Sequence, residues 1–534
     1  MKKYLKWLLL PLLIAVLLFG ISCTQEQEGE AEPVAVTKVK LNKTSLELNA
    51  GDTYTLKATA SPTEAPQDFV WTSSSNSYAT VTDAGVVTVK NSTDSTQTVK
   101  ITATSKSDST KKAVCTITVK VKTTLSKIGM ITSGPGEDSS TSIVISWHSP
   151  TQGSYLEYSD ANGDNPGAHV VANNQCHEAL STADWADVAT HYRCEVVLTG
   201  LTPNSVYQYQ IKDSAGTVAG TATFKTAGTD GAYSFMWLSD LHTPSGSSSY
   251  INRVKELIDY AEAKPDVDID FCLFSGDMVK KGQIYKHWNY WSNSGLMKNM
   301  VYAFLPGNHD YYGHNDKTRL TNAYFMDVCA YPDNNVCNQK SAAESNYWFI
   351  WNRVLFVCAD SVAEEGKKMS STGTSVEEMK AWFEEVVKAN AGNYNYLVFV
   401  QHYPLFTEDE PCEWGTYNEW RGLFDQYKVD FALSSDYHEY LCTKPLYNDT
   451  AVAMTDGKVI SGTVYITSYE TEGDHIGSLT NTAKETDKYA LFNGEGEVGG
   501  VYFTVTPTEM TMHLIGAGGA EKQTLTVVKK DRSN

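Results

Sequence analysis

Residues 233–242 read YSFMWLSDLH, an apolar run that ends in polar residues. The same design returns at four later places, and two intervening segments, 250–264 and 376–390, carry apolar residues at helical spacing. Apolar strands that alternate with amphipathic helices predict an α/β layered fold. The four later strand-and-tip segments are 271–277 (FCLFSGD), 301–310 (VYAFLPGNHD), 396–404 (YLVFVQHYP) and 431–438 (FALSSDYH).

The polar tips carry side chains that bind metal ions. In layered α/β folds, ligands bind beyond the C-terminal ends of the strands, so we expect the tips to share one crevice. Their donors are carboxylates, imidazoles and one amide, without a thiolate, which suits Mn, Fe or Zn. The candidate ligands are Asp240, His242, Asp277, Asn308, His402, Asp436 and His438.

The individual motifs differ in how much they indicate. Asp-x-His and Gly-Asp arise by chance in many chains, and an isolated histidine is more often structural. The run from Gly307 to Asp310 (GNHD) is far rarer: average residue usage predicts it in about one random chain in a few hundred. The ordered set of tips therefore carries the prediction, and His309 and Asp310 become candidate catalytic residues.

This order of motifs resembles the calcineurin-like metallophosphoesterase family, which includes the purple acid phosphatases. The resemblance covers about residues 232–470. It implies hydrolysis of a phosphate ester by water activated between two metal ions about 3.5–4 Å apart. It implies these roles: Asp240, His242 and His438 on the first metal, Asp277 bridging, Asn308, His402 and Asp436 on the second, His309 as the non-ligand catalytic histidine, and Asp310 orienting a neighbour or capping its loop.

Three positions depart from the family pattern. Asp436 stands where an imidazole is usual, so the second metal site either gains a carboxylate or is weak or empty. Lys280 stands where purple acid phosphatases have a metal-binding tyrosine, so we expect a colourless protein without tyrosinate-to-iron absorption. Ser435 replaces a glycine, which we expect to be a small adjustment.

Two β-rich segments precede this region. Residues 34–122 resemble a bacterial Ig-like (BIG2-type) domain and carry its Trp-x-Ser-Ser-Ser step at Trp71. Residues 126–228 resemble a fibronectin type III domain like the N-terminal domain of purple acid phosphatases, through Leu201-x-Pro-x-x-x-Tyr-x-Tyr. We predict two all-β Ig- and fibronectin-like sandwiches followed by a four-layer α/β metallophosphoesterase sandwich over 229–534. The Ig-like domain is expected to act as a spacer or to bind a glycan or surface partner.

The N-terminus resembles a bacterial lipoprotein signal. Lysines at 2, 3 and 6 precede a short apolar run, and small residues lead to Cys23. We predict a signal peptide over 1–22, an acidic tether over 23–33, and membrane attachment through a lipid on Cys23. The protein would then be an exported outer-membrane or cell-surface lipoprotein. The alternatives are a periplasmic location, or secretion with Cys23 removed.

The net charge limits the ligands that the chain can bind, and the cysteines indicate where disulfides could form. The formal net charge is −20, so we expect no binding to duplex nucleic acid. An anionic substrate would need the local charge of bound cations. Of ten cysteines, Cys272 and Cys358 are expected to be buried thiols. Export permits disulfides, and the candidate pairs are Cys329 with Cys337 and Cys176 with Cys194.

Two classes of function remain. The first is a dinuclear-metal-dependent phosphatase or phosphodiesterase. The second is a surface binding protein on the same scaffold whose altered Asp436 has weakened catalysis. The sequence contains neither the Gly-x-Ser-x-Gly elbow of serine hydrolases nor a P-loop.

Overall fold

The structure is a computed structural model. It describes residues 34–49, 51–90, 97–120, 123–160, 169–171, 175–178, 186–189, 191–244, 249–313, 324–334, 345–362, 375–412, 416–471, 481–494, 499–516 and 518–532. The predicted signal peptide, tether and lipidation site fall outside these residues. Within the described ranges, no helix is both long and apolar enough to span a lipid bilayer.

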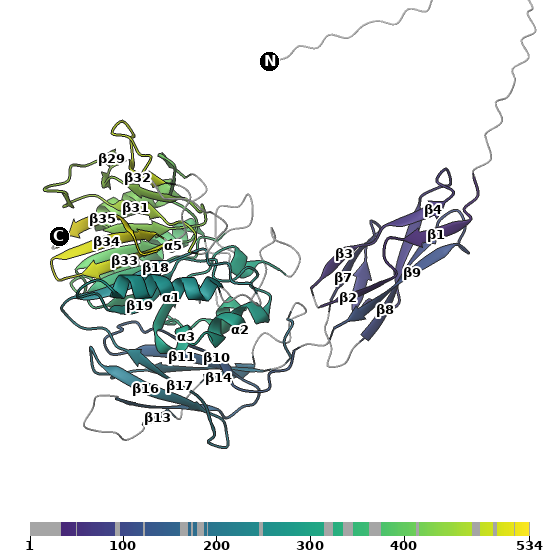
Figure 1. Cartoon of the computed structure of the whole chain (residues 1–534), viewed down its shortest axis with the longest axis horizontal. Coiled ribbons are helices and arrows are strands. Elements are labelled where there is room, and N and C mark those ends of the chain that lie inside the picture. The colour runs from purple at the N-terminus through teal and green to yellow at the C-terminus, as the bar shows by residue number, and fades with distance from the viewer. Residues whose placement is uncertain are drawn as a thin grey trace, which may run out of the picture.

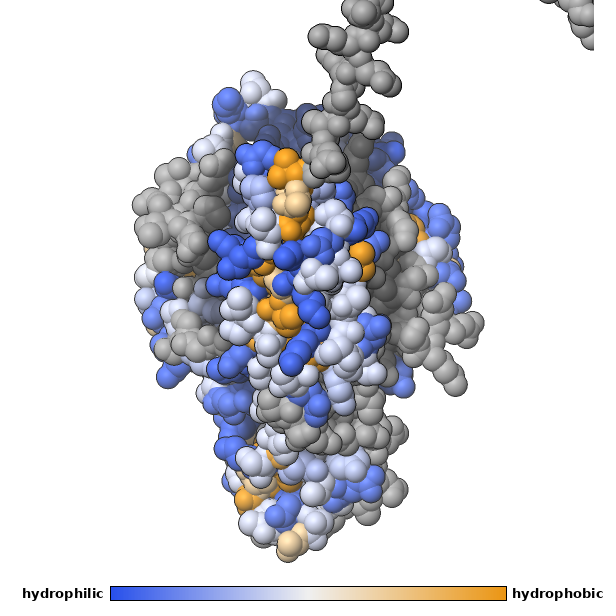
Figure 2. All heavy atoms as spheres, turned by 90° about the vertical axis from the view of Figure 1, so that its right-hand side faces the viewer, coloured by the Kyte–Doolittle hydropathy of each residue, from blue (hydrophilic) through white to orange (hydrophobic). Residues whose placement is uncertain are grey.

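In its described residues, the Ig-like module contains nine short strands, and Figure 1 draws this part of the chain in purple to blue. They form a four-stranded sheet β2-β9-β8-β5, a three-stranded sheet β3-β7-β6 and the pair β1-β4. Alternating residues of these strands face a core that includes Val99, Ile101 and Ile117. The face of the molecule drawn in Figure 2 is largely hydrophilic with a few apolar groups. Val34, Val70 and Val114 are exposed on this module. The strands are β1 Lys38–Leu41, β2 Ser45–Leu48, β3 Thr53–Thr55, β4 Ala58–Ser61, β5 Phe69–Ser73, β6 Ala79–Val81, β7 Val86–Val89, β8 Gln97–Ser105 and β9 Lys112–Val119.

The second module pairs two four-stranded antiparallel sheets, β10-β11-β15-β14 and β13-β12-β16-β17. Trp147 is fully buried, as its position in an apolar strand predicts. Tyr207 forms the expected strand corner: its hydroxyl accepts the backbone N–H of Thr202 at 2.8 Å. The strands are β10 Gly129–Pro135, β11 Ile143–Ser149, β12 Tyr155–Asp160, β13 His169–Val171, β14 Gln175–Glu178, β15 Tyr192–Leu198, β16 Val206–Lys212 and β17 Val218–Lys225.

The C-terminal domain contains two seven-stranded mixed sheets. The first has the order β20-β19-β18-β33-β34-β35-β30, and the second has the order β21-β22-β23-β26-β31-β27-β32. The first sheet comprises β18 Tyr233–Leu238, β19 Ile269–Phe274, β20 Val301–Phe304, β30 Lys458–Val459, β33 Gly499–Val505, β34 Glu509–Gly516 and β35 Glu521–Val528. The second comprises β21 Tyr347–Trp351, β22 Val354–Cys358, β23 Tyr396–Val400, β26 Phe431–Ser434, β27 Tyr440–Thr443, β31 Val464–Thr467 and β32 Ala490–Gly494.

Aromatic side chains fill the space between the two sheets. Phe235 of the first sheet stacks on Phe503 with ring centroids 4.6 Å apart, and meets Phe356 of the second sheet edge-on at 5.2 Å. These central strands are buried throughout, which explains why their sequences are continuously apolar and do not alternate.

Helices cover the outer faces of both sheets (Figure 1). Helix α1, which carries the expected apolar stripe, contacts β19 and β33 of the first sheet. Helices α5 and α6 share an apolar core with the second sheet, and a Ser375–Glu378 capping box begins α5. The predicted four-layer sandwich is thereby confirmed. The remaining elements are α1 Ser249–Glu262, α2 Tyr285–Asn293, α3 Leu296–Asn299, η2 His309–Tyr311, α4 Phe325–Val328, α5 Val376–Ala389, α6 Tyr417–Tyr427, and the ribbon strands β24 Phe406–Thr407, β25 Glu410–Pro411, β28 Leu446–Tyr447 and β29 Thr450–Ala451.

The second module and the C-terminal domain share one hydrophobic core. The Tyr209 hydroxyl donates to the Lys298 carbonyl at 2.7 Å, and the Ser139 N–H donates to the carbonyl of Ile350 on edge strand β21 at 3.0 Å. The module therefore covers a sheet edge and is fixed to the domain that carries the strand tips.

The cysteine predictions have mixed outcomes. Cys194 is disulfide-bonded and lies opposite Cys176 in the register of β14 and β15. Cys272 is a buried free thiol, as expected, and so is Cys358. The suggested pairing of Cys329 is wrong, because its thiol is free and buried in the core that both regions share, whereas Cys337 lies outside the described residues.

Candidate metal centre

The seven predicted ligands lie together at the C-terminal ends of five strands. Loops after β18, β19 and β20 of the first sheet meet loops after β23 and β26 of the second. Three groups of potential metal-binding side chains form there, and within each group the ligand atoms lie within 4.8 Å of one another. The groups are Asp240, His242 and His438; His242, Asp277 and His309; and Asp240, Asp277 and His402.

The Asp240 side of the centre contains the residues predicted for the first metal. His242 Nε2 lies 3.0 Å from Asp277 Oδ2, and His438 Nε2 lies 3.4 Å from Asp240 Oδ1. Asp240 is fully buried, yet its Oδ1 atom has no hydrogen-bond partner. A buried carboxylate oxygen whose one close partner is the His438 imidazole at 3.4 Å fits a bound cation, because a buried charge needs compensation.

The His402 side contains the residues predicted for the second metal. His402 Nε2 lies 3.1 Å from Asn308 Oδ1, 3.3 Å from Asp436 Oδ1 and 3.5 Å from Asp277 Oδ1. His402 Nδ1 lies 2.7 Å from the Ser275 carbonyl, which fixes the proton on Nδ1. Nε2 therefore faces the group of oxygens, and its lone pair would become available to a metal ion once the Nε2 proton leaves.

Asp277 lies between the two sides, as the predicted bridging ligand should. Its Oδ1 atom faces His402, and its Oδ2 atom faces His242. The nearby imidazoles outweigh the effect of burial and hold the pKa of Asp277 far below its usual range. The carboxylate is therefore ionised and available to cations at any pH near neutrality.

Two glycines of the motifs are required by close packing. A Cβ on Gly276 would lie 2.3 Å from His402 Nδ1, and Gly276 also has φ +112°. A Cβ on Gly307 would lie 2.2 Å from Asp277 Oδ1. The glycines before the aspartate and the asparagine thus let three loops reach one point.

Five of the seven candidate ligands have a strained backbone with positive φ. The values are 52° for Asp240, 46° for His242, 55° for Asp277, 68° for Asp436 and 61° for His438. Such conformations cost about 1–3 kcal/mol each in non-glycine residues, and they concentrate at functional sites. These strained conformations lower the stability of the fold and direct the five side chains towards one another.

Neighbouring carboxylates raise the pKa values of two histidines of the centre. Burial alone would lower the pKa of His402, but Asp277 and Asp436 outweigh it and raise the pKa to about 10. In the same way, Asp240 and Glu470 outweigh the burial of His438 and raise its pKa to about 11. Cation binding should therefore release protons from these histidines.

His309 lies beside this centre, with 22% of its side chain exposed. Its Nδ1 atom lies 3.0 Å from the main-chain carbonyl of Lys280, and its backbone N–H donates to Asp277 Oδ1 at 2.8 Å. Burial lowers the pKa of His309, so its neutral form presents an Nε2 lone pair towards the centre. A backbone oxygen thus orients this ring, whatever the Lys280 side chain does.

Asp310 connects two loops of the centre by hydrogen bonds to their backbones. Its fully buried carboxyl accepts backbone N–H groups from Gly307 at 2.9 Å, Val279 at 3.1 Å and Met278 at 3.3 Å. Burial raises its pKa to about 7. These contacts give Asp310 the loop-capping role, one of its two expected roles, and place it away from the open side of the centre.

Sequence reasoning missed two contacts. Tyr312 accepts a hydrogen bond from Asn308 Nδ2 at 2.7 Å, which turns Asn308 Oδ1 towards His402. Glu470 contacts His438 Nδ1. Ser435, expected to be a small adjustment, donates to the Ser275 carbonyl at 2.8 Å and lies 3.1 Å from His402 Nδ1. It thereby helps to seat that histidine.

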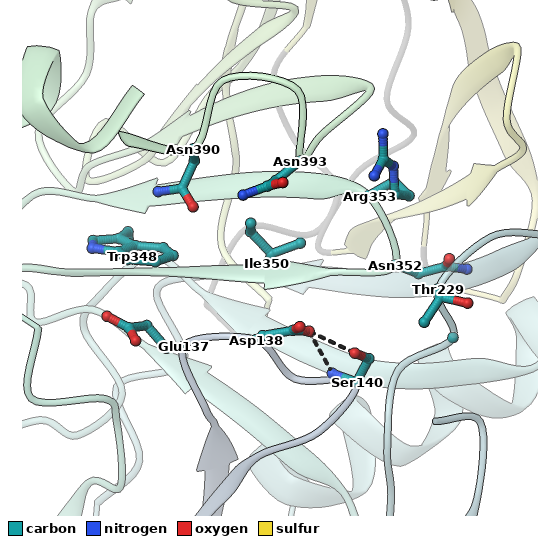
Figure 3. A pocket seen from close by; sticks show the side chains of 11 residues that line it. Glu137, Asp138, Ser140, Thr229, Trp348, Ile350, Asn352, Arg353, Asn390 and Asn393 are labelled. Carbon is teal, nitrogen blue, oxygen red and sulfur yellow. Dashed lines mark hydrogen bonds between the residues drawn. The ribbon is translucent and has the colours of Figure 1, made fainter. Parts of the chain in front are cut away.

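A separate cavity of about 290 Å³ lies where the second module meets edge strand β21 (Figure 3). Trp348, Ile350 and Arg353 line it from the C-terminal domain, and Glu137 and Asp138 line it from the module. None of the predicted ligands lines this cavity, so it is distinct from the metal centre.

Asp360 supports the GNHD loop and should make stability depend on pH. It accepts hydrogen bonds from Tyr311 Oη at 2.9 Å and Ser345 Oγ at 2.8 Å, and burial raises its pKa from 3.8 to about 6. The folded state thus prefers the protonated acid, so this contribution to stability is full below about pH 4 and lost as the pH rises through about 6. The free energy of unfolding of Asp360→Asn, measured relative to that of the wild type, should therefore increase by about 3 kcal/mol as the pH is raised from about 4 to about 7.

Urea unfolding of the metal-free protein at several pH values measures this difference. Asp268→Asn makes the same charge change at a side chain that is 80% exposed, and serves as the control. Parallel pH curves for Asp360→Asn and wild type would contradict the assignment.

Asp436 can be tested by restoring the imidazole that is usual at this position. Asp436→His replaces a hard oxygen donor with a borderline nitrogen donor, so the ratio of bound zinc to bound manganese should rise on the order of tenfold. Elemental analysis after dialysis against both metals measures this ratio. Asp436→Asn keeps an oxygen donor and should retain the wild-type preference. Unchanged metal content and kinetics in Asp436→His would place Asp436 outside the centre.

Comparisons with protein families agree with the order of the three regions. Residues 35–117 match the bacterial Ig-like domain (group 2), residues 131–226 match the purple acid phosphatase N-terminal domain, and residues 233–440 match the calcineurin-like phosphoesterase family. The family prediction is confirmed: the chain carries a calcineurin-like phosphoesterase domain behind these two β modules. A search of curated proteins gave no significant sequence match.

Two solved structures were compared with this chain. The purple acid phosphatase PPD1 from yellow lupin (Lupinus luteus) seeds aligns with a TM-score of 0.59 at 14% identity, over 93% of this chain and 96% of that chain. PhoD aligns with a TM-score of 0.48 at 12% identity, over 76% of this chain and 91% of that chain. The lupin enzyme supports the fold, and the calcineurin-like family fold implies a binuclear metal site.

Proposed function

We propose that this protein hydrolyses phosphate esters with two metal ions. One observation carries the proposal: Asp277 lies between two sets of nitrogen and oxygen donors that five separate loops bring together. Asp240, His242 and His438 would hold one ion, Asn308, His402 and Asp436 the other, and Asp277 both. The donor types fit Mn, Fe or Zn.

Bound ions would lower the pKa of a water molecule and neutralise phosphoryl oxygens as charge develops on them. The chain's own groups do the positioning. Asp277 presents one oxygen to each side, and Tyr312 holds the Asn308 amide so that its Oδ1 faces the centre. His309 would hold or release a proton at Nε2, because Lys280 O fixes its Nδ1.

The test is hydrolysis of a chromogenic phosphate monoester and of a matching diester by protein loaded with Mn, Fe or Zn. Turnover of either ester above that of the metal-free protein supports the proposal, and the ratio of the two rates assigns the substrate class. Background rates with every metal, in protein that nevertheless binds two ions, would favour the weakened binding protein instead.

We further propose that the enzyme is exported and held on the outer membrane or cell surface by a lipid on Cys23. The signal-like N-terminus supports this, and the Ig-like module would hold the catalytic domain away from the membrane as a spacer. Mass spectrometry of the mature N-terminus tests the proposal: an unmodified N-terminus, or one beyond Cys23, would reject lipid attachment.

A further inference from the structure

The imidazole of His438 has a carboxylate on each side. Its Nε2 atom lies 3.4 Å from Asp240 Oδ1, and its Nδ1 atom contacts Glu470 Oε1. Glu470 is 8% exposed and lies three residues beyond the end of β31 of the second sheet, in a segment without a metallophosphoesterase motif. The ring stands between Glu470 and Asp240, so Glu470 meets the nitrogen that faces away from the metal centre.

Hydrogen bonds to the first sheet hold the segment that carries Glu470 in place. The Thr471 N–H donates to the Ser239 carbonyl at 3.0 Å, and the Ser239 N–H donates to Thr471 Oγ1 at 3.1 Å. The Gly499 N–H donates to the Glu470 carbonyl at 3.3 Å. These bonds tie the end of β31 in the second sheet to the end of β18 and the start of β33 in the first. Glu470 is thereby held next to the tip that carries Asp240.

We propose that Glu470 is the positioning residue for His438, and that it holds the proton on Nδ1 and directs the Nε2 lone pair at the metal. The inference rests on the proposed function, because it requires a cation at Asp240. A carboxylate behind a ligating imidazole fixes the ring's tautomer and orientation and increases the basicity of the ligating nitrogen. Glu470 thus completes a carboxylate–histidine–metal arrangement that joins the two sheets.

The chain offers a matched control. His513 Nδ1 lies 3.0 Å from Glu521 Oε2, which is the same type of pair on β34 and β35, and no predicted ligand belongs to it. Glu521→Gln therefore makes the same chemical change as Glu470→Gln at a histidine outside the centre.

The experiment measures Mn²⁺ affinity by chelator competition, with Mn²⁺ alone as the probe. Loss of an outer carboxylate partner typically costs about 10–100-fold in metal affinity, and we expect Glu470→Ala to fall in this range. Glu470→Gln should lose less, because its amide oxygen still accepts the Nδ1 proton. Glu521→Gln should match wild type. Thermal unfolding of each metal-free variant checks that the fold is retained.

The outcomes separate this inference from the proposed function. Wild-type affinity in Glu470→Ala overturns the positioning role while Mn²⁺ binding by the wild type still stands. Equal and complete loss in Glu470→Gln and Glu470→Ala, as deep as that of a ligand variant, makes Glu470 a direct ligand and also overturns it. If the wild type binds no Mn²⁺, the series is repeated with Zn²⁺ and with iron, and failure to bind any of the three overturns the proposed function itself.

Discussion

Asp277→Asn should abolish turnover and lower the occupancy of both metal sites. The substitution keeps the shape of the side chain but removes the one carboxylate that faces both His242 and His402. Bound metal supplies several kcal/mol of transition-state stabilisation, and each 1.36 kcal/mol is a factor of ten, so we expect a loss of more than about 10³-fold in kcat/KM. Elemental analysis should show fewer than two ions per chain.

The control for this experiment is Asp268→Asn, just before the same strand β19. It removes the same charge from a side chain that is 80% exposed and pairs with Lys225. Its activity and metal content should equal those of the wild type. Retained activity in Asp277→Asn would refute the shared ligand, and with it the two-metal mechanism.

Much of this centre could be predicted because its signals are local. An apolar strand that ends in a polar tip is visible in the sequence, and parallel strands bring their C-terminal ends to one edge. Asp240, Asp277 and His402 were found in this way. The glycines before Asp277 and Asn308 also belong to the motifs. In the structure, a larger residue at either position would collide with His402 or Asp277.

What the sequence could not supply depends on contacts between distant segments. The bond from His309 to Lys280 uses a main-chain oxygen, which no side-chain pattern reveals. Glu470 follows the strand-like run VYITSY, as the other polar tips follow their strands, but a single glutamate carries no motif. The Cys329 proposal was wrong because closeness in sequence does not decide whether a thiol faces a partner or the core.

The sheet order was equally hidden from sequence reasoning. Strands β33, β34 and β35 come last in the chain, yet β33 pairs with β18 at the middle of the first sheet. That pairing supports the strand whose tip carries Asp240 and His242. Residues far beyond the last motif therefore contribute to the centre through the sheet, which no local pattern indicates.

His309→Ala should slow the reaction without emptying the centre. The ring lies beside Asp277, with Nε2 4.0 Å from Asp277 Oδ2, and its Nδ1 is committed to the Lys280 carbonyl. A general acid or base contributes about 10²–10⁴-fold, so kcat should fall by that factor. Metal content should stay near two ions per chain, because all seven predicted ligands remain.

Parallel measurements of kcat and metal content decide between two roles for this histidine. His309 also belongs to a group with His242 and Asp277 that could hold a cation. If His309→Ala lost metal as Asp277→Asn is expected to do, the ring would be a ligand and not the proton-transfer group. His513→Ala removes an imidazole outside the centre and should change neither quantity. A loss of kcat with both ions retained would show that His309 acts on the reaction and is not a metal ligand, as expected of a general acid or base.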